Sequence, residues 1–424
     1  MPKYWTPARI LRWWRPGLLA RAHIYIMGSC SSAPVSLRER QGVMKEEKRL
    51  LFHVLKEVLP DEKKTSWRRQ SQRKNAGGDD TLEGVRFGPD GHIVGLDFQN
   101  WQLGSTDISK LEALLRADCV EHLDLSYNPN LHGNVQILQK CSGVVELKLG
   151  DTSIVGNLSA LNLMQDLVRL GLSSTTFQGD LAAMDRHERL EELYLMGTQV
   201  MGDVASLKSC PKLRIVNLDG TDCTGKLGAF AALTGLAELR LTNTRVVGGL
   251  EQLADLKKLE HLDLSNTETG GSTESLSALV KLQTIRLANV QDIRGALCDF
   301  VPFDLLNTVD LGGTKIGGNV ENFRTKRSLE VVILAEGSTL GDVAVFGECR
   351  HLQELRIHGP DVAGDVGVFN GHRTLKVLDL ARTKVYGDAT GLAEQASLDF
   401  LDLAESLVSG PLLSSEKMTW ASMA

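Results

Sequence analysis

One hydrophobic pattern repeats along most of the chain. From residue 120 the motif L-x-x-L-x-L recurs, with Val or Ile replacing Leu at some positions. Its thirteen copies start at Val120, Val144, Leu167, Leu190, Leu213, Leu236, Leu259, Leu282, Leu306, Leu329, Leu352, Leu375 and Leu398. The spacing is 23 residues, except for 24 after Val120 and after Leu282. A fixed period of this length predicts a solenoid in which each unit packs only on its neighbours.

Each position of the unit predicts a local structure. Leu at the fourth and sixth positions alternates with polar residues, which indicates a short strand with one buried face, stacked into a parallel sheet. Eight units carry Thr at the ninth position, and Asn128 fills it in the first unit. We expect these side chains to bridge backbone groups of neighbouring turns. Every unit then has Gly at position 13, or 14 in the longer units, which indicates a bend that a side chain would obstruct.

On these motifs, residues 93 to about 420 resemble a leucine-rich-repeat domain, nearest to the plant-receptor-like class with its L-x-x-L-x-L-x-x-N-x-L-x-G pattern. The resemblance covers about three quarters of the chain. It implies an α/β leucine-rich-repeat solenoid, with a curved parallel sheet on the concave face and short turns or helical segments on the convex face. Two features depart from that class. Thr replaces the Asn of the motif, and Asp or Asn follows the Gly where plant receptors favour Ile-Pro.

The chain before the repeats predicts a helical N-cap. One helical face carries Leu50, Leu51, Val54, Leu55, Val58 and Leu59, and Pro60 ends the segment. Residues 84–98 then indicate a hairpin leading into a degenerate first repeat, so we expect fourteen stacked repeat strands. The predicted organisation is a basic flexible tail at 1–43, an N-terminal cap at 44–92 and the repeat domain at 93–424.

Composition adds an asymmetry of charge. With 42% hydrophobic and 24% charged residues the chain is of ordinary globular composition. Residues 1–80 hold 17 Lys and Arg against 8 Asp and Glu, whereas the remainder holds 30 against 45. An acidic array disfavours nucleic acid as a partner, because phosphates require a basic surface. The sequence has no uninterrupted apolar run of 18 residues, so it predicts no transmembrane helix.

The basic tail has several interpretations. Residues 1–27 contain Arg, Lys and Trp without an acidic residue, as in an organelle transit peptide or a membrane-surface segment. If translation starts at Met27, Gly28 becomes a candidate myristoylation site and Cys30 a candidate palmitoylation site. Further along, Arg68-Arg69-Gln70-Ser71 makes Ser71 a candidate phosphorylation site, although a solvated linker explains the same residues.

The cysteines favour a reducing compartment. Their number, seven, is odd, which argues against a closed disulfide framework. Cys141, Cys210 and Cys349 share one repeat position, where other units have Leu, so we expect small buried core residues. The sequon at Asn157 points weakly towards the extracellular side.

No motif predicts catalysis. Residues 220–226 imitate a phosphate-binding loop, G-x-x-x-x-G-K, but Leu227 stands where Ser or Thr should hold magnesium. We interpret this as a coincidence of the repeat. Metal-ligand spacings and assembled catalytic motifs are missing from the sequence. We therefore expect no cofactor and no enzyme activity.

Binding is expected on the outward-facing residues of the strands. The fifth positions include an alternating-sign ladder, for which mutual neutralisation is the simpler explanation. A better binding candidate is the segment with exposed aromatic and Met residues on a polar face. The full candidate set is Glu191, Glu192, Tyr194, Met196 and Asn217, followed by the ladder Arg240, Asp263, Arg286 and Asp310.

Together these features predict a non-catalytic protein-interaction scaffold that grips a protein partner on its concave face, in signalling or regulation. We expect a cytoplasmic protein that associates with a membrane through its tail, with organelle targeting as the alternative for localisation. An extracellular receptor-like ligand binder is the alternative function. An unrecognised enzyme is the least favoured one.

Overall fold

The computed structural model describes residues 36–61, 63–65, 82–115, 119–334, 338–393 and 395–409. The candidate modification sites Gly28, Cys30 and Ser71 lie outside the described residues. The chain divides into two compact units, Met1–Arg169 and Leu170–Ala424. The first holds the cap and the first repeats, and the second holds the remaining repeats.

The N-terminal unit begins with helix α2 (Leu37–Val58). Its N-cap, Ser36, accepts a hydrogen bond from the Glu39 N–H, and the Glu39 carboxylate accepts one from the Ser36 N–H. This capping box satisfies backbone donors that the first turn leaves unpaired. The helix therefore starts before the predicted cap boundary at residue 44, inside the segment that we expected to be a flexible tail. Its end before Pro60 is as predicted.

The predicted hairpin follows, as strands β1 (Val85–Phe87) and β2 (Ile93–Asp97) in antiparallel pairing. The hairpin packs tightly on α2. At Gly91, which has φ +92°, a Cβ atom would lie 2.5 Å from the backbone oxygen of Arg40. His92 Nδ1 lies 2.9 Å from Glu47 Oε1, and this hydrogen bond raises the pKa of His92. The contact joins the cap helix to the first repeat strand.

The repeat strands form one main sheet. Its hydrogen-bonded order in the described residues has 15 strands, β1 and then the even-numbered strands from β2 to β28. Since β1 is the antiparallel hairpin strand, fourteen repeat strands remain, as predicted. In the N-terminal unit β4 (His122–Asp124) and β6 (Glu146–Lys148) follow β2, and β8 (Arg169–Gly171) spans the division. The C-terminal unit continues with β10 (Glu192–Tyr194), β12 (Ile215–Asn217), β14 (Glu238–Arg240), β16 (His261–Asp263), β18 (Thr284–Arg286), β20 (Thr308–Asp310), β22 (Val331–Leu334), β24 (Glu354–Ile357), β26 (Val377–Asp379) and β28 (Phe400–Asp402).

A second set of short strands follows the ninth position of the repeats. It forms three smaller sheets, with the orders β3-β5-β7, β19-β17-β15-β13-β11-β9 and β21-β23-β25-β27-β29. Their bounds are β3 (Thr106–Asp107), β5 (Asn128–Asn134), β7 (Thr152–Val155), β9 (Gln178–Asp180), β11 (Gln199–Asp203), β13 (Asp222–Lys226), β15 (Arg245–Gly249), β17 (Glu268–Ser272), β19 (Asp292–Arg294), β21 (Gly318–Asn319), β23 (Thr339–Asp342), β25 (Asp361–Asp365), β27 (Lys384–Asp388) and β29 (Leu407–Ser409).

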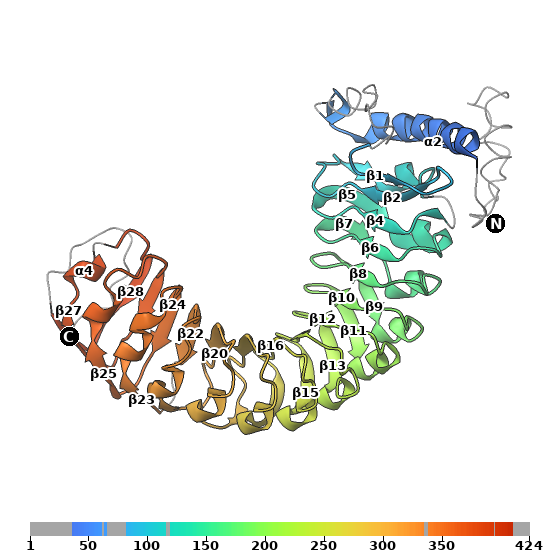
Figure 1. Ribbon diagram of the computed structural model, residues 1–424. Coiled ribbons are helices and arrows are strands. Elements are labelled where there is room, and N and C mark those ends of the chain that lie inside the picture. The colour runs from blue at the N-terminus through green and yellow to red at the C-terminus, as the bar shows by residue number, and fades with distance from the viewer. Residues whose placement is uncertain are drawn as a thin grey trace, which may run out of the picture. The chain divides into compact units, whose positions relative to one another are not determined.

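One short helical turn completes most repeats. These turns are η2 (Ile108–Leu111), η4 (Val135–Lys140), η5 (Leu158–Leu161), η6 (Leu181–Met184), η7 (Val204–Ser209), η8 (Leu227–Ala229), η9 (Leu250–Leu253), η10 (Thr273–Leu276), η11 (Leu297–Phe300), η12 (Val320–Phe323), η13 (Val343–Glu348), η14 (Val366–Phe369) and the α-helical α4 (Thr390–Ala393). Within the C-terminal unit, main-sheet strands such as β16 and β20 lie on the inner side, while β15 and β23 lie towards the outer side (Figure 1).

The core lies between the main sheet and these turns. Leu193, Leu262 and Leu378, at the fourth position of their units, are fully buried, and Phe230 and Phe346 close the core from the turns. The shared cysteine position is buried too, as predicted. The side chains at this position, Cys141, Cys210 and Cys349, are at most 2% exposed, and Cys210 and Cys349 are free thiols.

The ninth-position side chains do not all work as expected. Asn128 does bridge neighbouring turns, since its Nδ2 donates to the Phe98 carbonyl and its Oδ1 accepts from the Leu103 N–H. The threonines instead donate to the carbonyl three residues earlier in their own repeat, as Thr244 does to Leu241 at 2.7 Å. The expectation that Thr links neighbouring turns was wrong, because its hydroxyl is too short to reach beyond its own turn. The eight are Thr152, Thr175, Thr198, Thr221, Thr244, Thr267, Thr314 and Thr383.

The residue after the repeat glycine has a clear role. In eight repeats it is an Asp or Asn whose side chain accepts the N–H two residues on and so caps the helical turn. At Gly202, with φ +110°, a Cβ atom would lie 2.3 Å from the carboxylate of Asp180 in the preceding repeat. The glycine is therefore required by its backbone conformation and by the neighbouring cap.

Candidate binding surface on the main sheet

The register of the main sheet places the fifth positions of successive repeats side by side. In the C-terminal unit each fifth-position residue is paired with the next one along the array. We call this line of outward-facing positions the fifth-position row. It comprises Tyr194, Asn217, Arg240, Asp263, Arg286, Asp310, Ile333, Arg356, Asp379 and Asp402. Since parallel strands are about 4.8 Å apart, neighbouring side chains of the row are in reach of each other.

The first part of this surface is apolar and accessible. Tyr194 is half-buried, and Met196, two residues further along, is 41% exposed. The Tyr194 hydroxyl donates to Glu192 Oε2 at 3.5 Å. We call Glu192, Tyr194 and Met196 the tyrosine–methionine patch. A half-buried tyrosine and an exposed methionine beside a carboxylate suit contact with another protein.

Two further candidates lie beside this patch with structural roles. The Glu191 carbonyl accepts the N–H groups of Arg214 and Ile215 and so joins two repeats. Asn217 is only 9% exposed, and its Oδ1 accepts the Asp219 N–H at 3.0 Å. The Asn217 side chain therefore offers a ligand little surface.

The ladder of alternating charges forms in part. Arg286 Nη1 lies 3.9 Å from Asp263 Oδ2, as the alternating pattern suggests. Arg240 instead pairs with Glu238 on its own strand. Asp310 is half-buried, which raises its pKa, although the Gly312 N–H and the Arg286 charge oppose this. Charges in this part of the row are thus satisfied within the sheet.

Sequence analysis missed a shared function of the acidic side chains. All seven Asp or Asn residues of the fifth position accept the backbone N–H two residues later, which ends the strand in an Asx turn. These seven are Asp97, Asp124, Asn217, Asp263, Asp310, Asp379 and Asp402. The alternation of Asp with hydrophobic residues was visible in the sequence, but it indicated only an exposed face.

A second missed feature is an ion network at β24 and β26, which we call the Asp379 network. His358 Nε2 lies 2.7 Å from Asp379 Oδ1, and Arg356 Nη1 lies 3.6 Å from Asp379 Oδ2. Arg356 also pairs with Glu354 and lies over the Phe400 ring, 5.3 Å from its centroid. A signal existed in the sequence, because Arg356 and His358 are two residues apart and so share a strand face.

The network shifts the pKa values of its members in opposite directions. Burial would raise the pKa of Asp379, but the hydrogen bond and charge of His358, with the charge of Arg356, hold it below its ordinary value. The hydrogen bond to Asp379 raises the pKa of His358 against the effect of burial. The charged forms therefore stabilise each other.

The described part of the chain shows no further chemical site. The segment that imitates a phosphate loop forms strand β13 and its preceding turn, where Thr221 hydrogen-bonds within the repeat. Among the described residues, no group of three or more His, Cys, Asp or Glu side chains could hold a metal ion. The described helices include none that is long and apolar enough to span a membrane.

Solved structures with the same fold are plant receptor ectodomains and bacterial repeat proteins. The Arabidopsis receptor kinase HAESA, in complex with the peptide hormone IDA and the co-receptor SERK1, matches with TM-score 0.56 and 15% identity over 91% of this chain and 82% of that chain. An internalin from Listeria monocytogenes matches with TM-score 0.53 and 16% identity over 85% and 98%. The leucine-rich-repeat ectodomain of GASSHO1/SCHENGEN3 from Arabidopsis thaliana, in complex with CASPARIAN STRIP INTEGRITY FACTOR 2, matches with TM-score 0.52 and 17% identity over 71% of this chain.

These matches establish the leucine-rich-repeat fold of the chain, as the sequence predicted. The alignment covers 40% of the GASSHO1 ectodomain, so this chain corresponds to less than half of that protein. No family model matches the sequence. No curated protein sequence matches it either.

Proposed function

We propose that this protein is a non-catalytic recognition module that holds a protein partner on its main sheet, with the tyrosine–methionine patch at the centre of the contact. The observation that carries the proposal is the exposure of Met196 beside half-buried Tyr194, in a row whose arginines form ion pairs within the sheet. Large aromatic and Met side chains dominate the energetics of interfaces when a partner buries them.

The solved complexes support this choice of ligand. HAESA is seen with a peptide hormone and a co-receptor, and GASSHO1 with CASPARIAN STRIP INTEGRITY FACTOR 2. Those proteins share the fold with this chain at low identity. The inference that this chain also binds a protein or peptide therefore rests on the exposed patch as well as on the fold.

The test compares two double variants with matched side chains on opposite sheets. Tyr194→Ala with Met196→Ala removes the patch, while Tyr386→Ala with Met201→Ala removes a tyrosine and a methionine that are 52% and 53% exposed on β27 and β11. A partner is first captured by photo-crosslinking at position 196 and at position 201, and its Kd is then measured with purified proteins. We expect the patch variant to bind about 30-fold more weakly and the control variant to bind like the wild type. Equal loss in both variants, or in neither, would contradict the proposal.

We propose that the protein acts in the cytoplasm as a scaffold in signalling or regulation. Its basic tail would bring it to a membrane through acylation at Gly28 and Cys30. Intact-mass measurement of the native protein tests this. A mature chain that starts at acylated Gly28 would support it. An unmodified chain from Met1, or one cleaved elsewhere in the tail, would contradict the lipid anchor.

An extracellular receptor-like ligand binder is the second candidate. Asn157 favours it, since this residue of the N-x-S sequon is exposed on the surface. Its Oδ1 already accepts the Ser159 N–H at 3.0 Å as the cap of η5. A mass shift on glycosidase treatment, together with non-reducing peptide mapping of the seven cysteines, separates the two candidates. Glycan at Asn157 would establish the extracellular one.

A further inference from the structure

Helix α2 sorts its charged side chains onto separate faces. Arg38, Lys45, Arg49 and Lys56 are spaced seven, four and seven residues apart, which places all four within a narrow stripe at 100° per residue. All four side chains are exposed. Glu39, Glu46 and Glu57 form a parallel exposed stripe at about 80 to 100° from the centre of the basic one, so the basic stripe itself holds only cations.

The opposite face of α2 holds the helix against the N-terminal unit. Met44, Leu51, Val54, Leu55 and Val58 are each at most 8% exposed. Burial of this face fixes the rotation of the helix about its own axis. The basic stripe is therefore held towards solvent by the packing of the cap.

An apolar side chain lies at the edge of the stripe. Phe52 is half-buried and lies about 20° from Lys45 on the helical wheel, on the side away from Lys56. We call Phe52, Arg38, Lys45, Arg49 and Lys56 together the basic face of α2. An aromatic ring beside cations places apolar surface next to groups that attract anionic lipids.

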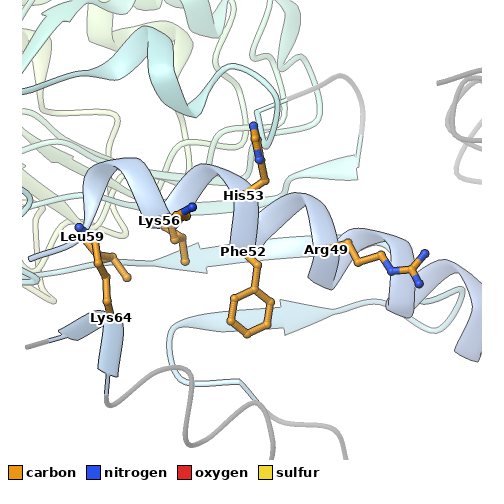
Figure 2. Close-up of a pocket in the computed structure, with 7 residues that line it drawn as sticks. Arg49, Phe52, His53, Lys56, Leu59 and Lys64 are labelled. Atoms are coloured by element: carbon orange, nitrogen blue, oxygen red, sulfur yellow. The ribbon is translucent and has the colours of Figure 1, made fainter. Parts of the chain in front are cut away.

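The basic face continues into a pocket of about 290 Å³ at the C-terminal end of the helix. Arg49, Lys56 and Lys64 supply its positive charges, while Leu55 and Leu59 supply apolar surface (Figure 2). His53 completes the basic lining. The pocket can thus receive an anionic group that has an apolar body next to it.

The cations of this region are only weakly neutralised. Arg49 pairs with Glu46 three residues earlier, and Lys64 pairs with Asp61 at 2.9 Å. More than half of the Arg49 and Glu46 side chains and 94% of Asp61 are exposed. Exposed pairs of this kind contribute little and are easily exchanged for another anion.

We propose that the basic face of α2 docks on an anionic lipid surface, with lipid phosphates at Arg49, Lys56 and Lys64 and Phe52 at the headgroup level. The stripe from residue 38 to residue 56 is about 27 Å long at 1.5 Å per residue. A single small anion would occupy only one end of it, whereas a charged surface contacts the whole stripe. Each Lys or Arg near such a surface strengthens binding by about fivefold. This surface is distinct from the main-sheet face of the proposed function.

The experiment is co-sedimentation of the full chain with vesicles of phosphatidylcholine alone or with about 30% phosphatidylserine. The test variant replaces Arg38, Lys45, Arg49 and Lys56 by Gln. The matched control replaces four exposed lysines of the repeats by Gln, Lys208, Lys212, Lys257 and Lys258. Both variants keep the tail, so tail binding is constant. Thermal melting checks that both remain folded.

We expect wild type and control to bind the anionic vesicles alike and the test variant to bind at least 30-fold more weakly. The neutral vesicles should bind none of the three. The proposal is overturned if the test variant binds like the wild type, or if the control loses as much. The proposal is also overturned if vesicle binding is lost only when residues 1–35 are deleted, because the tail would then be the lipid-binding element. Competition by millimolar inorganic phosphate at constant ionic strength would assign the site to a small anion instead.

Discussion

The tyrosine–methionine patch and the Asp379 network lie on the same sheet face, yet they use it differently. In the patch, Met196 is 41% exposed and offers its surface to a partner. In the network, Asp379 is 7% exposed, and its carboxylate is shared by Arg356, His358 and the Ala381 N–H. A polar face of a repeat array is therefore not uniformly a binding face, because charges that satisfy each other contribute to stability instead.

The largest expected effect tests whether the two regions stand on equivalent cores. Leu193 lies under the patch and Leu378 under the network, and both are fully buried. We expect Leu193→Ala and Leu378→Ala each to lower the free energy of unfolding by about 3 kcal/mol, from lost burial and the cavity left behind. Denaturant titration measures this. If the losses of unfolding free energy in the two variants differ by more than about twofold, the regions differ in the core as well as on the surface.

The next largest effect is expected from Asp379→Ala, which should lower stability much more than a substitution in the tyrosine–methionine patch. It removes the partner of two cations and leaves the Ala381 N–H without its acceptor. We expect a loss of about 2 kcal/mol, because the network is partly exposed. Met196→Ala should change stability by less than about 0.5 kcal/mol. Asp379→Asn, which keeps the shape and the backbone hydrogen bond, is the control. A stability loss at Met196 that equals the loss at Asp379 would remove the distinction.

The contact between Arg356 and Phe400 should contribute less. The guanidinium lies 5.3 Å from the ring centroid. A double-mutant cycle of Arg356→Ala and Phe400→Leu should give a coupling energy of about 0.5 kcal/mol, the value for an exposed cation–π pair. Arg356→Lys keeps the charge but loses the planar stacking, so it should forfeit most of that coupling. Zero coupling would mean that Phe400 only fills space.

The smallest effect is a pH dependence confined to the network. The pKa of His358 is raised, so its stabilisation is present below its unfolded pKa, about 6.5, and is lost as pH rises through the folded value. The pKa of Asp379 is lowered, so its stabilisation is present above its unfolded pKa, about 3.9, and is lost as pH falls through the folded value. The stability difference between wild type and His358→Gln should thus be largest at about pH 5 to 6. Thermal melting from pH 5 to 9 checks it, with exposed His351→Gln as the control. If the stability difference between wild type and His358→Gln does not change with pH, the stabilisation does not come from the charge of His358.

Local patterns predicted much of the fold. The 23-residue period predicted the stacked strands, the buried leucines and the shared cysteine position, since each of these follows from contacts within one repeat or with the next. The start of α2 was misplaced because the capping box at Ser36 and Glu39 was not weighed. The threonine ladder was misjudged because the reach of a hydroxyl depends on the distance between turns, which the sequence does not contain.

The face of the sheet was predictable in its position but not in its chemistry. Period-two alternation was enough to find the outward residues, including Tyr194 and Met196. Which charges pair is decided by distances across strands: Arg286 reaches Asp263, whereas Arg240 turns to Glu238 on its own strand. Since 23 residues separate such partners along the chain, only the stacking of the repeats brings them together. The same holds for the basic face of α2, where a helical period shows the stripe but only the packing of the opposite face directs it to solvent.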